Sequence, residues 1–263
     1  MRCVSRFRIS THAFLFVALL GFSPALNGRA SAEPTEDRSR CRASQVDIVL
    51  DVGHTPESPG ATSARGTSEF VFNNGLAEDS ERALRKAGFR TVVLHEHGKG
   101  RDQLKKRVET TNQVAPAIFL SIHHDSVQPR YLRSWNVDGA AQRYSDDFSG
   151  YSIFVAGPSP WSDRSVEFST LLAEALIRYS MHPSLHHAIP IPGEGRLLLN
   201  ERLGIYSNNG LYVLRNAHVP SVLLEAGLIV NRNDELKLQS QSTRSAIAAS
   251  IVDAVHTFCD KAN

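Results

Sequence analysis

Three side chains in this sequence are of types that bind metal ions, and each stands where a predicted element begins or ends. His54 follows an apolar run, Glu69 opens a stretch with helical spacing, and His123 ends a second apolar run. Two imidazoles and one carboxylate are a common ligand set of catalytic zinc sites, which keep a fourth position open for water. Taken singly, each residue also fits an ordinary turn, core or helix-dipole role, and no HExxH signature is present. Spacing alone therefore leaves the metal site open.

Glu225 adds a fourth chemical group. It ends the very apolar run at residues 222–224, so its carboxylate stands where burial is costly without a partner. One interpretation is an ion pair with an arginine, such as Arg215 or Arg232. The other is a general base that acts beside a metal ion in hydrolysis.

Alternating strands and helices would bring these four residues together. Apolar runs typical of strands alternate with amphipathic stretches typical of helices. The predicted strands are residues 46–52, 90–94, 117–122, 151–156, 210–214 and 221–225. The first predicted helix runs from a cap at Thr67 or Ser68 to a stop at Gly88. The others span residues 102–114 and 165–179, and a closing helix has an apolar stripe from Ile247 to Phe258. This alternation predicts a layered α/β domain with a mostly parallel sheet, whose strand ends share one edge. The strand order stays open.

Other segments carry weaker expectations. The charges at residues 99–107 are expected on the solvated face of a helix. Residues 127–150 read as an insertion over the active face, either loop or short helix, and residues 182–209, with four prolines, as a functional loop. Asp125 could orient a ligand imidazole. His124, His186 and His187 are expected at the surface, with the lining of a groove as the alternative.

The N-terminus is typical of an exported protein. Three arginines precede an apolar run at residues 13–22, which is shorter than the ~20 residues of a membrane span, and small residues follow up to Ala32. We therefore expect a signal peptide at 1–32, a flexible lead-in at 33–44, no stable membrane anchor, and a monomer in the periplasm or secreted. Cleavage would remove four arginines and change the formal net charge from +2 to −2, which argues against a nucleic-acid partner.

Two cysteines remain after that cleavage. Cys41 and Cys259 stand near opposite ends of the remaining chain. In an oxidising compartment they could form a disulfide that ties the two ends together, or stay as separate thiols.

Five passages together resemble a known family, and they span nearly all of the chain after the signal peptide. They are IVLDVGH at 48–54, GTSE at 66–69, residues 107–112 with the strand and SIH at 121–123 that follow, GLYVLR at 210–215, and VLLEAGLIVN at 222–231. The chain resembles zinc-dependent N-acetylmuramoyl-L-alanine amidases of the type 3 family, which cut the bond between sugar and stem peptide in peptidoglycan.

The resemblance implies the fold and the roles of the site residues. It implies an α/β domain at 45–263 with a central sheet of about six strands flanked by helices. It also implies that His54, Glu69 and His123 bind Zn²⁺ and that Glu225 is the catalytic glutamate. The substrate would be peptidoglycan or a muropeptide. A zinc peptidase acting on wall-derived peptides, or a non-catalytic wall-binding domain, stays as an alternative.

Two passages depart from the family pattern. Residues 95–102 match it only loosely, and the insertion at 127–150 is longer than in the smallest members. Some cell-division members carry a helix in this region that plugs the zinc site until an activator protein displaces it. The insertion could be such a regulatory plug, with Asp138, Asp146 or Asp147 touching the metal.

Overall fold

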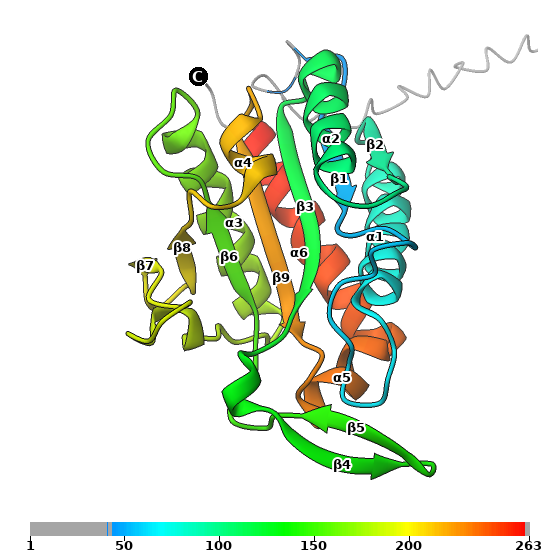
Figure 1. Cartoon of the computed structure of the whole chain (residues 1–263). Helices are drawn as coiled ribbons and strands as arrows, with labels where there is room; N and C mark the ends of the chain where they lie inside the picture. The colour runs from blue at the N-terminus through cyan, green and yellow to red at the C-terminus, as the bar shows by residue number, and fades with distance from the viewer. Residues whose placement is uncertain (1–40, 42–43, 261–263) are drawn as a thin grey trace, which may run out of the picture. The chain divides into compact units, whose positions relative to one another are not determined.

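A seven-stranded sheet forms the centre of the computed structural model, which describes Cys41 and residues 44–260 (Figure 1). The sheet order is β2-β1-β3-β9-β6-β8-β7, with β1 (Ile48–Val52), β2 (Thr91–Leu94), β3 (Ile118–Asp125), β6 (Ser152–Val155), β7 (Leu197–Asn200), β8 (Ile205–Ser207) and β9 (Ser221–Leu228). Only the β6–β9 and β7–β8 pairs are antiparallel. The predicted α/β class and mostly parallel sheet are confirmed.

Helices cover both faces of this sheet (Figure 1). They are α1 (Glu69–Lys86), α2 (Arg101–Val114), α3 (Ser162–Arg178), α4 (Tyr212–Asn216), α5 (Arg232–Gln239) and α6 (Gln241–Asp260). Helices α1 and α3 both contact α6 on one face, and α2 lies against α4 on the other. Within the described part of the chain, no helix combines the length and the apolar character that a membrane crossing requires.

The central strands are buried on both faces because their successive side chains feed two separate cores. In β1, Ile48, Leu50 and Val52 pack into the larger core, under α1, α3 and α6. Val49 points the other way and packs with Val108 of α2 in the smaller core. This two-sided burial explains why the strands are continuous apolar runs rather than alternating ones.

Three predictions about elements were wrong or incomplete. The sheet has seven strands rather than about six, because β7 and β8 form inside residues 182–209, which were expected to be only a loop. Residues 210–214 are not a strand: the chain turns there and begins α4, whose Val213 and Leu214 are buried in the smaller core. Residues 127–150 contain a β-hairpin, β4 (Arg133–Val137) and β5 (Ala140–Tyr144), rather than a loop or short helix.

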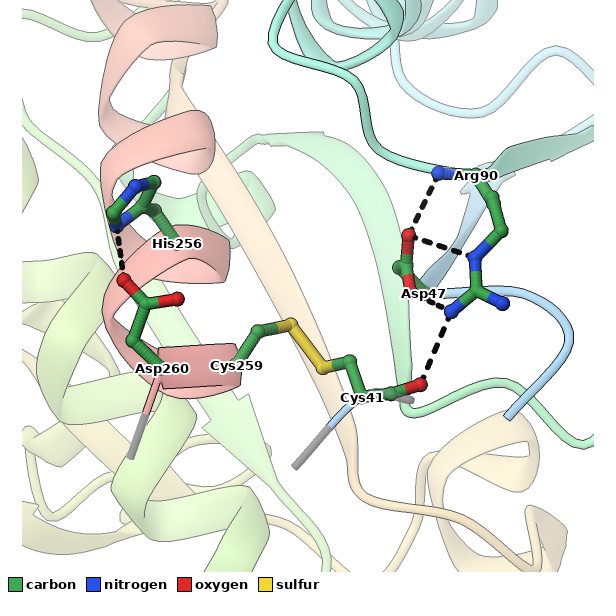
Figure 2. The surroundings of a disulfide bond; sticks show 6 residues. All are labelled: Cys41, Asp47, Arg90, His256, Cys259 and Asp260. Carbon is green, nitrogen blue, oxygen red and sulfur yellow. Dashed lines mark hydrogen bonds and ion pairs between the residues drawn. A yellow bond between two sulfur atoms is a disulfide. The ribbon is translucent and has the colours of Figure 1, made fainter. Parts of the chain in front are cut away.

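A disulfide joins the two ends of the described chain. Cys41 and Cys259 are bonded, with Cα atoms 5.1 Å apart and both residues fully buried, so the disulfide alternative is the one found. Figure 2 shows that Arg90 also ties down this end: its guanidinium donates to the Cys41 carbonyl, at 3.1 Å, and to the Asp47 carboxylate. The predicted signal peptide and most of the lead-in lie outside the described residues, but at Cys41 the lead-in is already anchored.

The disulfide should contribute measurably to stability, because it closes a loop with a sequence separation of 218 residues. We expect the double variant Cys41→Ser, Cys259→Ser to lose about 2–5 kcal/mol of free energy of unfolding in guanidinium titrations followed by circular dichroism. Reductant should lower the midpoint of the wild type towards that of the variant and leave the variant unchanged. Equal midpoints for oxidised wild type and variant would contradict this account.

Candidate metal centre

The structure brings His54, Glu69 and His123 together at the carboxyl edge of the sheet. The Nε2 atom of His54 lies 3.0 Å from Glu69 Oε2, and Nδ1 of His123 lies 3.0 Å from Glu69 Oε1. The two rings meet edge to face, with centroids 4.9 Å apart. One donor atom from each residue lies within 4.8 Å of the other two. Two imidazoles and a carboxylate in this arrangement fit the three protein ligands of a divalent transition-metal ion.

Each side chain is placed by a different element. His54 follows β1 with a backbone φ of 67°, a conformation that is uncommon outside glycine and is found at strained functional positions. Glu69 is the first residue of α1, where the helix dipole favours a carboxylate. His123 lies in β3, next to β1 in the sheet. The ends of two parallel strands and one helix start thus converge on a single point.

Two glycines leave the room that this cluster needs. A Cβ atom at Gly53 would overlap the ring of His123. A Cβ at Gly60 would overlap Glu69 Oε2 and approach His54 Nε2 to 2.7 Å, and Gly60 also has a positive φ of 77°. Only glycine combines that backbone conformation with the missing side chain.

Burial and hydrogen bonding act in opposite directions on Glu69, which is 4% exposed. Burial raises its pKa, but hydrogen bonds from His123 and His54 outweigh this effect and hold the pKa well below its usual range. Asn73, one turn further along α1, donates to Glu69 Oε1 at 3.2 Å and to the Gly53 carbonyl at 3.0 Å. Glu69 is therefore a fixed, ionised carboxylate, as a metal ligand must be.

Glu225 lies directly opposite His123 on the neighbouring strand β9. Its Oε2 atom is buried and has no hydrogen-bond partner among the described residues. Burial raises its pKa well above the usual range, and the negative charges of Asp125 and Glu69 add to this. Neither candidate arginine pairs with it: Arg215 donates to the Asn209 carbonyl and Arg232 to Asp146. The ion-pair interpretation of Glu225 is therefore wrong.

Sequence reasoning missed the residue that holds the His54 turn. Arg107 was expected on a solvated helix face, but it is 1% exposed and reaches from α2 into the sheet edge. Its guanidinium donates to the Asp51 carboxylate and to the carbonyls of Val52 and His54. The only available signal was its place inside a passage that resembles the family.

The expectations for the other histidines and for Asp125 were also wrong. His124 is 2% exposed and hydrogen-bonded through Nδ1 to Asn73 Oδ1 at 2.8 Å, and burial lowers its pKa to about 3, so it is a neutral core residue. His186 is 4% exposed and the His187 side chain 14%, so neither is a surface histidine. Asp125 contacts these two histidines rather than a ring of the first cluster.

The carboxylates of residues 127–150 lie away from the cluster. Asp146 accepts from Arg232 Nε at 2.9 Å, and Asp147 accepts from Arg133 at 2.7 Å. Asp138 occupies the turn between β4 and β5, in the hairpin that extends past the carboxyl end of β3 in Figure 1. None of the three belongs to a group of potential metal ligands in the described chain. The expectation that one of them touches the metal is not met.

A cavity of about 480 Å³ opens beside the cluster, on the α2 and α4 side of the sheet. Its lining includes Gly53, His54 and His123 at the cluster, together with Leu104 of α2 and Tyr212 of α4. A lining that combines potential metal ligands with apolar side chains is a common composition for a ligand-binding site.

Comparison with known proteins agrees with this geometry. A model of the N-acetylmuramoyl-L-alanine amidase family matches residues 48–257. The amidase AmiC of Escherichia coli O6:H1 is 25% identical over 251 residues, which cover 89% of this chain but 56% of AmiC, so the chain spans little more than half of that relative.

Solved amidase structures share the fold. The enzyme of Mycobacterium smegmatis matches with 21% identity and a TM-score of 0.61, over 82% of this chain and 97% of that one. The CwlD amidase of Clostridioides difficile, solved in complex with the GerS lipoprotein, matches with 20% identity and a TM-score of 0.60, over 81% and 98%. With the family match over residues 48–257, the chain belongs to the type 3 family of N-acetylmuramoyl-L-alanine amidases.

Proposed function

We propose that this protein is a zinc-dependent hydrolase that cuts the amide bond between N-acetylmuramic acid and L-alanine in peptidoglycan or its fragments. The observation that carries the proposal is the convergence of His54, Glu69 and His123, with Glu225 opposite His123 on the next strand. Family membership supports the same chemistry. The cavity beside the cluster gives the substrate a place to bind.

In this proposal each residue of the site has its own role in the reaction. His54, Glu69 and His123 would hold the ion, which when bound acts as a Lewis acid on the scissile carbonyl and activates water for attack. Glu225 accepts the proton of the attacking water and donates it to the amine of the leaving alanine. Burial raises the pKa of Glu225 above its usual range, so this carboxyl group holds a proton more readily than an exposed glutamate does. Asn73 and Arg107 keep Glu69 and the His54 turn in place.

A zinc peptidase acting on wall-derived peptides is the second candidate, because it would use the same four residues. A non-catalytic wall-binding domain is less well supported. Such a domain has no need of a buried, unpartnered carboxylate oxygen beside a potential metal site, and retaining one costs stability.

We further propose that the protein works outside the cytoplasm, in the periplasm or secreted, as a monomer. The signal-like N-terminus supports export, and so does the disulfide, since disulfides persist in oxidising compartments. Residues 127–150 remain our candidate for a regulatory element that contacts an activator protein, through the outward hairpin rather than through a metal ligand. The CwlD amidase solved with a lipoprotein is a precedent for a protein partner.

Product analysis tests the proposal directly. The purified protein is incubated with peptidoglycan, with and without zinc, and the released fragments are identified by mass. Free stem peptides with an N-terminal alanine, released only with metal, would establish the amidase. Sugar-linked peptides with internal cuts would establish the peptidase instead, and no release under any condition would contradict both.

The variant Glu225→Gln removes the proton acceptor and keeps the shape of the side chain. We expect turnover of peptidoglycan to fall by about 10²–10⁴-fold, with zinc content unchanged. Glu78→Gln, on the exposed side of α1, is the matched control and should keep wild-type activity. If Glu225→Gln turns over like the wild type, Glu225 is not the proton acceptor.

Gly60→Ala tests whether the cluster is built around an ion. The added Cβ meets the carboxylate of Glu69 and the ring of His54, so we expect zinc affinity to fall by about 10–100-fold, measured by competition with a chelator. Gly98→Ala is the control, because Gly98 has a similar positive φ of 91° but open space around its Cβ. If Gly60→Ala and Gly98→Ala bind zinc with equal affinity, the space left by Gly60 is not needed for metal binding.

A further inference from the structure

A second cluster of potential metal ligands lies beside the first and shares no donor with it. Asp125 ends β3, while His186 and His187 lie in a 3₁₀ turn, His186–Ala188, within the connection from α3 to β7. Asp125 Oδ2 is 2.8 Å from His187 Nε2 and 3.3 Å from His186 Nε2. These distances bracket the 3.0 Å spacings of the first cluster.

The remaining ring nitrogens are occupied, so both Nε2 atoms face Asp125. Nδ1 of His187 lies 2.9 Å from Glu194 Oε2, and a carboxylate can only accept, so this nitrogen carries the proton. Nδ1 of His186 lies 2.9 Å from the Ser184 hydroxyl. A histidine that donates its Nδ1–H to a carboxylate keeps a free lone pair on Nε2. Metal-binding histidines commonly make such a hydrogen bond through the nitrogen that does not bind the metal.

Protonation alone does not satisfy this cluster. A proton on each ring nitrogen of His187 would complete a line of hydrogen bonds from Asp125 to Glu194. That proton does not satisfy His186, whose buried Nε2 lies 3.3 Å from Asp125 Oδ2 but makes no hydrogen bond to any described residue. A buried ring nitrogen that makes no hydrogen bond destabilises the folded protein.

Charge leads to the same conclusion. The Asp125 and Glu194 side chains are 11% and 10% exposed, and the neighbouring cation-forming groups are the two imidazoles themselves. With neutral imidazoles, two buried negative charges remain. One divalent ion between Asp125, His186 and His187 would balance both charges and occupy every donor that faces the centre.

The two rings are also held ready for such an ion. They stack on each other with centroids 3.8 Å apart, and Phe148 and Phe154 pack against them from either side, at 5.4 and 5.0 Å. Tyr206 fixes the turn by donating to the Ser184 carbonyl at 2.8 Å. The planes of the two imidazole rings are tilted by 38°, and this packing restricts their rotamers before any ion binds, as in a preorganised ligand pair.

We propose that Asp125, His186 and His187 bind a second divalent transition-metal ion, with Glu194 orienting His187. Two imidazoles and one carboxylate suit Zn²⁺ and other late first-row ions more than Ca²⁺ or Mg²⁺, which take oxygen ligands. The proposal goes beyond the hydrolytic function and does not depend on it, because it concerns donors that the first site leaves unused.

Zinc stoichiometry tests the second site. The full chain is stripped with chelator, reloaded with Zn²⁺, freed of excess ion and analysed for zinc per chain. We expect two ions in the wild type and one in each of His186→Ala, His187→Ala and His54→Ala. Glu194→Gln keeps all three ligands, so it should still fold, and we expect its second-site affinity to fall by about 10–100-fold. His182→Ala, a histidine of the same connection outside the cluster, should still bind two.

Cobalt loading gives an independent readout. Co²⁺ in the second site should add a visible absorption band that disappears in His187→Ala and persists in His54→Ala. One zinc ion in both the wild type and His187→Ala would overturn the proposal and leave the cluster as a network of ion pairs. That result would not touch the hydrolase assignment, which is judged by product analysis and by the loss of zinc in His54→Ala.

Discussion

The fully buried guanidinium of Arg107 is the interaction on which the site geometry depends. It enters the sheet edge from α2 and donates to the Asp51 side chain and to the carbonyls of Val52 and His54. A helix is thereby attached to the exact point at which β1 ends and the chain takes the positive φ of His54. Removing one partner would leave an uncompensated buried charge, at a cost of about 3–5 kcal/mol, and would release a turn whose backbone conformation is itself unfavourable by about 1–3 kcal/mol.

Three carboxylates at the same edge show how burial can be used in different ways. Glu69 is ionised because two imidazoles and Asn73 bond it. Asp125 is ionised for a similar reason: burial opposes ionisation, but His187 and His186 lower its pKa to about 2. Glu225 lacks such partners, and its pKa moves upwards. The fold thus separates two anchored, ionised carboxylates from one whose negative charge is disfavoured, and the mechanism proposed above uses this difference.

Local patterns in the sequence were sufficient to predict most of the fold. The predicted strands at residues 46–52, 117–122 and 221–225 became the buried central strands β1, β3 and β9, and Glu69 opens α1 as expected. The passage at residues 210–214 failed because a short apolar run does not distinguish a strand from a buried helix. Its outcome is decided by packing against α2. Strand β7 was hidden in a proline-rich segment and forms only because β8 offers it an edge.

Local sequence patterns also identify only some of the site residues, so the functional residues fall into two kinds. His54, Glu69, His123 and Glu225 could be singled out because each marks the end of a local pattern, and parallel topology then brings such ends to one edge. Their roles as ligands and base stay predictions, but their convergence is a property of the fold.

Arg107, His186 and His187 could not be found in this way. A charged side chain in a helix, or in a polar connection, is normally solvated, so its burial depends entirely on a partner contributed by a distant segment. For Arg107 that partner is Asp51, 56 residues away, and for His187 it is Asp125, 62 residues away. Residues of this second kind become visible only when the structure is known, and the second cluster of potential metal ligands is made partly of them.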